Sequence, residues 1–281
     1  MSYKLSFAIF AMLLSSICQA QKFTAYRAAN MQPVSVTDMA AELSTANVVF
    51  VGEEHNDSMA HVLQYELFKA LYQVKGNQLA LSLEMFETDC QVPLNDYLQG
   101  FATEAQMIKD ARAWGNYKDY RPLVEYAKEQ QLYVLAANAP RRYVNLVARR
   151  GMPSLDSLSK EAKQWLPKLP YDTLDGAYAK KFWNLMGGHG RPSIYHSQSL
   201  WDASMSYSIY QYQKKHKKEL VYHLCGRFHS DDKSGTVEQL QRRNKKLVIK
   251  NVTCIPKTIA DAMTKEALAA IADFVVITEN E

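Results

Sequence analysis

Six short, mainly apolar runs recur along this chain, and the stretches between them have helical character. This alternation restricts the possible folds more than any other feature. The runs cover residues 47–51, 79–83, 132–137, 220–224, 247–252 and 274–278. Strands that alternate with helices form a largely parallel sheet whose two faces are covered. We therefore expect an α/β protein with a mainly parallel central sheet flanked by helices.

The stretches between the runs predict individual helices. Apolar residues between positions 59 and 74 recur at spacings of three and four, which indicates an amphipathic helix capped by Asn56, Asp57 or Ser58. A second helix is expected to follow Pro122, because the fixed φ of proline suits a first helical turn.

The strand pattern stops between residues 141 and 192, where prolines and glycines separate short helical pieces. This stretch is predicted to be a small helical subdomain inserted into the α/β domain. A longer helix is expected from Ser193 to about Lys215, with Gln198, Asp202 and Met205 on one face.

The N-terminus has the features of an export signal. Lys4 precedes an apolar run over residues 5–17, and Cys18-Gln19-Ala20 follows it. The run is too short for a lone membrane anchor, which needs about 20 residues, so we expect cleavage after Ala20 and an α/β domain over residues 21–281. The predicted location is the periplasm or cell envelope. Lipid anchoring through Cys18 is an alternative, although Ile17 replaces the small residue usual before a lipidated cysteine.

Charge argues against a nucleic-acid-binding protein, and cysteine content argues against one built on a disulfide framework or a zinc site. The formal charge is only +4, and the basic runs 214–218 and 242–246 are interpreted as solvated helix ends or turns. Nucleic-acid binding is therefore not expected. Cys90, Cys225 and Cys254 would remain after cleavage, an odd number without paired CxxC spacing, so they predict neither a disulfide framework nor a zinc site.

Polar residues directly follow four of the predicted strands. The segments are Gly52-Glu53-Glu54-His55, Glu84, Asn138 with Arg141, and Gly226-Arg227-Phe228-His229. Ligands of parallel sheets bind just outside the carboxyl ends of the strands. A single such residue often only caps the next helix, but Glu84 ends an apolar strand directly, where a carboxylate needs a partner. We therefore expect a polar functional site at this edge.

Two carboxylates and two imidazoles at this edge could act as an acid–base group or hold a divalent metal ion. The predicted catalytic or metal-binding residues are Glu53, His55, Glu84 and His229. Arg121, Asn138 and Arg141 are predicted to bind substrate, the arginines by clamping an anionic group. The chain contains no HExxH, P-loop, GxGxxG or GxSxG motif, so the corresponding mechanisms are not supported.

Six segments together resemble a known family. They are residues 52–57, 83–86, 120–122, 136–141, the set Gln198, Asp202 and Met205, and residues 226–229. In this order, and over nearly the whole mature chain, they resemble the ChaN-like haem-binding proteins of the Tiki superfamily. The resemblance implies a large, mainly parallel sheet with a small helical domain.

The resemblance also implies a function in bacterial iron acquisition. Its members can bind haem as a cofacial pair at a homodimer interface with a tyrosine iron ligand, which is sensible because phenolate favours ferric iron. Haem would be the cofactor, and an outer-membrane haem receptor system a partner. The candidate ligands are Tyr178 and Tyr195, with His189 and His196 as partners for iron or propionate.

More distant relatives in the superfamily use the corresponding glutamates and histidines for hydrolysis, some of them with metal. A hydrolase, metal-dependent or metal-independent, is therefore the alternative to a haem-binding protein. A purely structural envelope protein is disfavoured, because polar groups at a buried edge would lower stability without a task.

Overall fold

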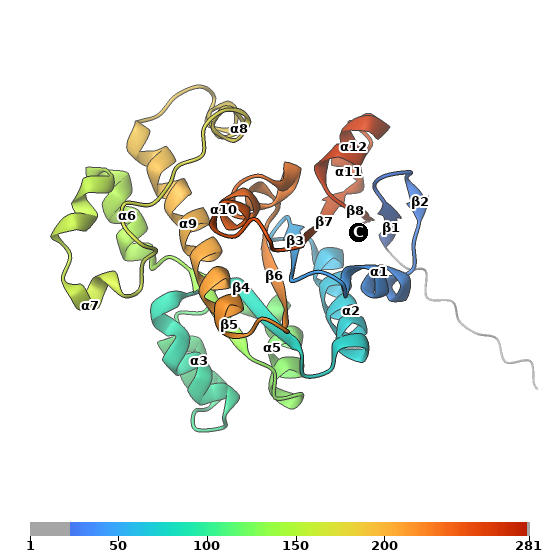
Figure 1. The fold of residues 1–281 in the computed structure, drawn as a ribbon, viewed down its shortest axis with the longest axis horizontal. Helices are drawn as coiled ribbons and strands as arrows, with labels where there is room; N and C mark the ends of the chain where they lie inside the picture. The colour runs from blue at the N-terminus through green and yellow to red at the C-terminus, as the bar shows by residue number, and fades with distance from the viewer. Residues whose placement is uncertain (1–22, 280–281) are drawn as a thin grey trace, which may run out of the picture.

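A computed structural model describes residues 23–279, so the predicted signal segment and Cys18 lie outside the described residues. The chain forms an eight-stranded sheet in the order β2-β1-β8-β7-β3-β6-β4-β5 (Figure 1). The strands are β1 Phe23–Arg27, β2 Gln32–Pro33, β3 Val48–Glu53, β4 Leu79–Glu87, β5 Val134–Asn138, β6 Leu220–Gly226, β7 Ile249–Pro256 and β8 Phe274–Thr278.

Strands β3 to β8 run parallel to one another, whereas β1 pairs antiparallel with β8 and β2 pairs antiparallel with β1. Each predicted apolar run overlaps one of the six parallel strands. The α/β fold with a mainly parallel sheet is thereby confirmed. The antiparallel pair β1–β2 was not predicted from the sequence.

Helices cover both faces of the sheet. On one face the largest apolar core lies between the strands and helices α1 to α5. These are α1 Val36–Leu43, α2 Ser58–Lys75, α3 Gln91–Leu98, α4 Glu104–Asp110 and α5 Tyr117–Glu129. On the other face a second core joins the sheet to α9 Pro192–Lys215 and α10 Thr236–Arg243. The short helices α11 Lys257–Ala260 and α12 Lys265–Ile271 pack beside β7 and β8.

Short helices occupy the stretch for which a helical insertion was predicted. They are α6 Arg141–Arg150, a 3-10 helix Met152–Ser157, α7 Lys160–Lys163 and α8 Ala177–Leu185. They lie at the left and top of Figure 1, beside the N-terminal half of α9. The α6 region and α9 share one apolar core that includes Tyr143 and Leu200, and α8 shares a separate one with Tyr195.

The helix starts agree with the sequence in two cases and differ in one. Asp57 caps α2 by accepting from the N–H groups of Met59 and Ala60, and α9 begins at Pro192. Helix α5 begins at Tyr117, however, and Pro122 lies inside it. A proline removes one backbone donor and crowds one carbonyl. Burial of Tyr117 and the other apolar side chains of this helix against the sheet outweighs that local cost.

Strand β5 forms one edge of the sheet. The side chain of Gln91 binds some of the backbone groups that β5 leaves without a neighbouring strand. The Gln91 amide donates to the carbonyl of Val134 and accepts from the N–H of Ala136, both at 2.8 Å. Gln91 therefore makes the pair of bonds that a neighbouring strand would make.

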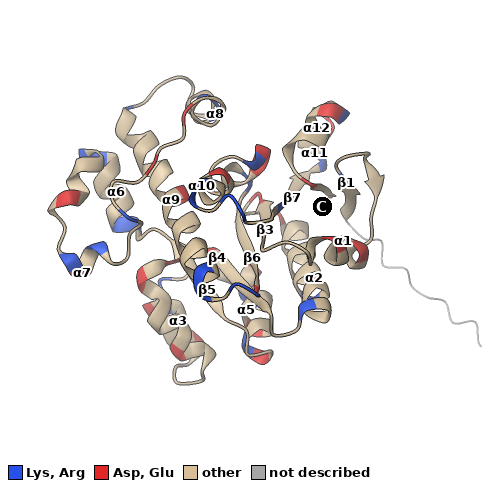
Figure 2. Ribbon diagram, in the orientation of Figure 1, with Lys and Arg blue, Asp and Glu red and all other residues tan. Residues whose placement is uncertain are grey.

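The structure also shows where the basic runs and the three cysteines lie. The two basic runs lie at the C-terminal ends of α9 and α10 (Figure 2), and most of their residues are solvent-exposed. Cys90, Cys225 and Cys254 are free and buried. No helix among residues 23–279 is both long enough and apolar enough to cross a membrane.

Candidate functional site

The carboxyl ends of three neighbouring strands bring the predicted polar residues together. Strand β6 lies between β3 and β4, so Glu53 at the end of β3 and Glu84 in β4 flank Gly226 at the end of β6. His55 lies two residues after the end of β3, and His229 lies in the 3-10 helix after β6. The four residues predicted as a site therefore meet at one edge of the sheet.

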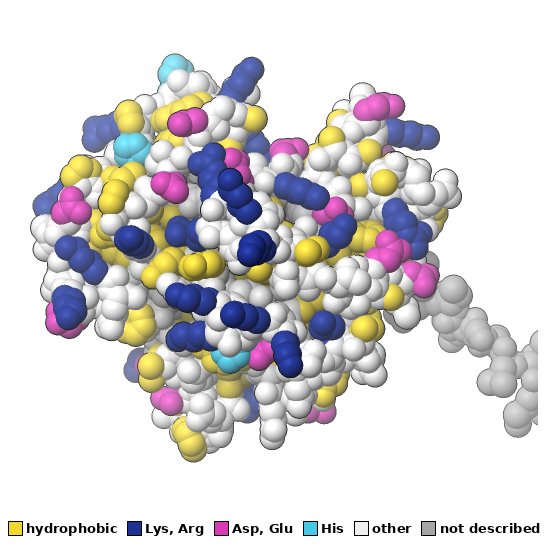
Figure 3. All heavy atoms as spheres, in the orientation of Figure 1, with side chains coloured by type: hydrophobic (Ala, Val, Ile, Leu, Met, Phe, Trp, Pro, Cys, Tyr) yellow, Lys and Arg dark blue, Asp and Glu magenta, His cyan; other side chains and the backbone are white. Residues whose placement is uncertain are grey.

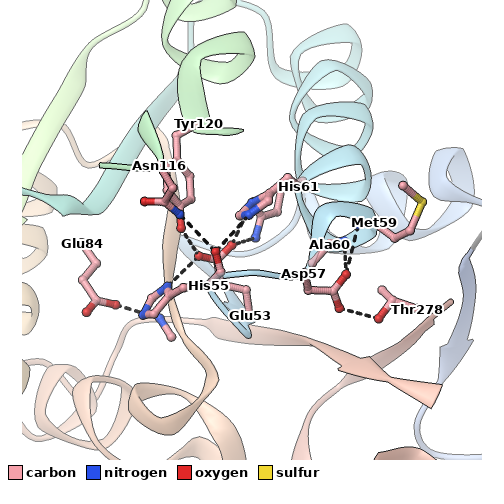
Figure 4. Close-up of polar contacts among 12 residues, drawn as sticks. Glu53, His55, Asp57, Met59, Ala60, His61, Glu84, Asn116, Tyr120 and Thr278 are labelled. Carbon is pink, nitrogen blue, oxygen red and sulfur yellow. Dashed lines mark hydrogen bonds and ion pairs between the residues drawn. The ribbon is translucent and has the colours of Figure 1, made fainter. Parts of the chain in front are cut away.

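Glu53 is a buried carboxylate surrounded by donors (Figure 4). It accepts from the Tyr120 hydroxyl at 2.5 Å and from Gln64 Nε2 at 2.5 Å, and the nearer nitrogens of His55 and His61 lie 2.8 and 3.3 Å from its oxygens. Burial raises the pKa of this carboxyl, but the hydrogen bonds from the two histidines and Gln64 lower it by more. The resulting pKa is about 2, below the usual value of 4.5. Glu53 is therefore ionised and fixed in position.

His55 is the accessible member of the His55–Glu53 pair, with 41% of its side chain exposed. Its ring packs edge-on against Trp114, with centroids 5.0 Å apart, and Asn116 donates to its backbone carbonyl at 3.1 Å. A Cβ added to Gly226 would lie 3.0 Å from His55 Nε2, so the glycine leaves room for the ring. Burial lowers the pKa of His55, but Glu53 and the charge of Glu84 raise it more.

His229 forms a second carboxylate–imidazole pair, which is buried. Its Nδ1 lies 2.7 Å from Asp202 Oδ1, and its Nε2 lies 3.8 Å from Glu84 Oε1. Asp202 comes from α9 and also accepts from the hydroxyls of Thr236 and Tyr178, at 2.8 and 2.5 Å. Burial lowers the pKa of His229, but the charges of Asp202 and Glu84 raise it to about 9. His229 is therefore protonated at neutral pH.

Glu84 lies between the two pairs. One of its oxygens accepts from the N–H of Gly226 at 2.7 Å, and the other faces His229. A pocket of about 360 Å³ opens beside this group, and its lining includes Glu53, His55 and, from α8, Lys181 and Leu185. The accessible His55 imidazole is hydrogen-bonded to the ionised Glu53 and lies beside Glu84 and the charged His229. In these surroundings it can accept and donate protons.

The arrangement fits acid–base chemistry more directly than metal binding. Both oxygens of Glu53 already accept hydrogen bonds. Among residues 23–279, the group whose three ligand atoms lie within 4.8 Å of one another is Glu87, Asp89 and Cys90, rather than the predicted set. The two carboxylates of that group pair with Arg112 at 2.6 and 2.5 Å, and Asp89 also pairs with Arg142, so two guanidinium groups compensate their charge.

The three predicted substrate-binding residues have different surroundings. Arg121 is half-exposed and pairs with Glu104 at 2.6 Å. Asn138 is buried at the end of β5, where its side chain accepts from the N–H of Ala139 at 2.8 Å and fixes the turn into α6. Arg141, the first residue of α6, lines a pocket that also reaches Trp114. Of the three, Arg141 is the one that the structure places in a pocket.

The tyrosines predicted as haem ligands are buried and already hydrogen-bonded. Tyr178 donates to Asp202, and Tyr195 donates to the carbonyl of Leu174. Burial, aided by the charge of Asp202, raises the pKa of Tyr178 well above its usual value and that of Tyr195 to about 12. Iron ligation by either phenolate would require these bonds to break, so neither phenol fits haem in this conformation.

The two predicted histidines are more accessible. His189 is exposed in the glycine-rich loop after α8. His196 is half-buried, and its carbonyl accepts from the Tyr171 hydroxyl at 2.7 Å.

Sequence reasoning missed the residues that hold the two histidine–carboxylate pairs. His61 and Gln64 lie one turn apart on the buried side of α2, and both contact Glu53. Asp202 was placed on a common helix face with Gln198 but not in the site. A detectable signal was present, since polar residues on the buried face of an amphipathic helix need partners.

The fold and site define an α/β protein with a glutamate–histidine centre at the carboxyl edge of its sheet. The family model described as "Haem-binding uptake, Tiki superfamily, ChaN" matches residues 39–240, and the chain belongs to this family. The resemblance stated from the sequence is thereby confirmed.

Two solved structures have a similar fold. ChaN of Campylobacter jejuni, described in terms of cofacial heme binding, superposes with a TM-score of 0.70 at 17% identity, covering 92% of this chain and 97% of that one. An erythromycin esterase mutant in its open conformation superposes with a TM-score of 0.55 at 9% identity, covering 91% and 97%. At such identities the likeness concerns the fold alone. A comparison with curated proteins gives no match.

Proposed function

We propose that this protein binds haem and acts in the uptake or handling of haem iron. The family match and the cofacial heme described for the similar ChaN of Campylobacter jejuni support the proposal. The main support from this chain itself is the exposed surface at the end of α8. Haem needs an apolar face to cover and a ligand for its iron.

The end of α8 offers both features. Leu185 and Met186 are 72% and 38% exposed, and His189 is exposed three residues later. Figure 3 shows apolar side chains and histidine exposed over α8 and the loop that follows it. Gly187 and Gly188 have positive φ, and the His189 N–H bonds to the Met186 carbonyl at 3.3 Å, so the loop returns toward the helix. We propose this face as the haem surface, with His189 as the candidate iron ligand.

A cofacial pair of haems requires two copies of the chain, so the proposal includes a homodimer formed on haem binding. It also includes export, which follows from the predicted signal over residues 1–20. The protein would then work in the periplasm or cell envelope, either free or anchored through Cys18, with an outer-membrane haem receptor system as its source of haem.

A hemin titration followed at the Soret band tests the proposal, together with the sedimentation of the free and loaded protein. We expect a saturable spectrum, dimerisation on loading, and weaker binding in His189→Ala. The matched control is His216→Ala, because His216 is also exposed but lies at the far end of α9. Tyr178→Phe and Tyr195→Phe test the phenolate alternative. A titration without saturation would exclude haem binding.

A second candidate function is hydrolysis at the sheet edge. It is favoured by the two carboxylate–imidazole pairs on either side of Glu84, an arrangement more elaborate than helix capping requires. In this proposal His55, oriented by Glu53, acts as the general base that takes a proton from the attacking water and then gives it to the leaving group. The buried, protonated His229 stabilises the negative charge that develops beside it.

A screen of ester and amide substrates tests this second function. Activity should be lost in His55→Gln, whose folding is checked by thermal unfolding, and should survive chelation of divalent metals. Activity that needs zinc or manganese would replace the acid–base mechanism with a metal-dependent one. Activity that is unchanged in His55→Gln would exclude the site.

A further inference from the structure

A second pocket, of about 670 Å³, lies beside the glutamate–histidine site at the same edge of the sheet. Three of its lining residues are arginines, Arg112, Arg141 and Arg142, and we call it the guanidinium pocket. Its lining also includes Glu87, Trp114, Asn116 and Asn145. The elements that form it are the end of β4, the loop before α5 and the first turn of α6.

The charges in the guanidinium pocket do not balance. Arg112 pairs with Glu87 and Asp89, and Arg142 pairs with Asp89. Three guanidinium groups therefore meet two carboxylates. Within residues 23–279 no carboxylate forms an ion pair with Arg141, which is exposed to the pocket. The free cation gives the pocket a preference for an anion.

The start of α6 strengthens this preference. No side chain caps the helix, whose N-cap residue is Pro140. The first N–H groups of a helix have no partner within it, and together with the helix dipole they favour negative charge. Arg141 and Asn145 lie one turn apart on this helix, so both can reach a group bound at its start.

The guanidinium pocket adjoins His55. Trp114 lines the pocket and packs against the His55 ring, and Asn116 lines the pocket and donates to the His55 carbonyl. Trp114 and Asn116 stand between the guanidinium pocket and His55, so a ligand that is held in the pocket and passes Trp114 would reach the acid–base group.

We propose that the guanidinium pocket binds the oxyanion group, carboxylate or phosphate, of a ligand whose remainder lies at His55. Arg141 is the main ligand-binding residue, because Arg112 and Arg142 already have carboxylate partners. Guanidinium groups bind both kinds of oxyanion through paired N–H donors. The proposal stands independently of haem binding at α8, and where the second candidate function holds it restricts the substrate to anionic compounds.

Titrations of the full chain with inorganic phosphate and with succinate, followed by calorimetry and by the fluorescence of the tryptophans, test the proposal. We expect saturable binding of at least one anion, and binding about tenfold or more weaker in Arg141→Gln, as the loss of a charge-assisted hydrogen bond predicts. The matched control is Arg150→Gln, because Arg150 is exposed in the last turn of the same helix. It should bind as the wild type does.

The outcomes separate the sources of the anion. Preference for phosphate or for succinate identifies the group, and a parallel loss of hemin affinity in Arg141→Gln would identify the propionates of haem as the carboxylates bound. Failure of both anions to bind saturably, or equal weakening in both variants, would overturn the proposal. Neither result would affect the hemin titration of the wild type, so haem binding is judged separately.

Discussion

Replacement of Asp202 by asparagine should weaken the fold in a pH-dependent way. In the wild type the pKa of His229 rises from 6.5 to about 9, mainly because the charges of Asp202 and Glu84 outweigh burial. Such a rise corresponds to about 3 kcal/mol of stability. A histidine with a raised pKa contributes this stability fully below pH 6.5, and the contribution is lost as the pH rises through 9.

The Asp202→Asn variant keeps the shape of the side chain but removes its charge. Its free energy of unfolding should fall by up to about 3 kcal/mol at pH 6 through His229, and by less at pH 9.5, where the imidazole is mostly neutral in both proteins. The value is an upper limit, because Glu84 remains 3.8 Å from the ring. Urea denaturation from pH 6 to 9.5 measures the difference.

The control is Thr236→Val, which removes one hydrogen bond to the same carboxylate without changing any charge. It should lower the free energy of unfolding by about 1 kcal/mol at every pH. Parallel stability curves for wild type and Asp202→Asn would refute the assignment of a charged His229.

Three further predictions concern the packing around the site. Gly226→Ala should fold but displace His55, because the new Cβ would lie 3.0 Å from a ring that can move, and a changed His55 signal in NMR spectra would show it. Gly52→Ala should instead lose about 1–3 kcal/mol in urea denaturation, because its Cβ would lie 2.9 Å from the Arg227 backbone; an unchanged midpoint would contradict this. Asp57→Ala should lose about 1–2 kcal/mol, because α2 loses its cap, and the same denaturation assay with an unchanged midpoint would show that the cap is dispensable.

The sequence predicted the sheet well because both faces of a parallel strand are buried. Strands of this kind contain continuous apolar runs, as in 48–51 of β3, and such runs need no tertiary information to be found. The end of β3 was also predicted correctly, since polarity changes abruptly at Glu53. The second strand was predicted to stop before Glu84, but β4 continues to Glu87, with an irregular register between Leu83 and Glu87 that the sequence pattern does not reveal. The pair β1–β2 was missed because β2 is two exposed residues long and carries no such pattern.

The partners within the site could not be predicted with the same success. Asp202 and His229 are 27 positions apart, and their contact depends on where α9 crosses the sheet. The place of Tyr178 in the helical stretch predicts a haem ligand, but its hydroxyl is directed inward to Asp202. The direction of a tyrosine on a short helix depends on which side of that helix is covered, and the sequence of α8, with apolar residues on several sides, does not specify it.

The Gln91 amide on β5 has a consequence for self-association. An uncovered edge strand is a template on which further chains can add, and proteins commonly block such growth with charge, proline or a bulge. Here one neutral side chain binds the backbone groups of Val134 and Ala136 that an incoming strand would need. Two copies of this chain would therefore have to meet through side-chain surfaces rather than by extending a common sheet across β5. Loss of the Gln91 amide would leave the backbone groups of this edge strand free to pair with a strand of another chain.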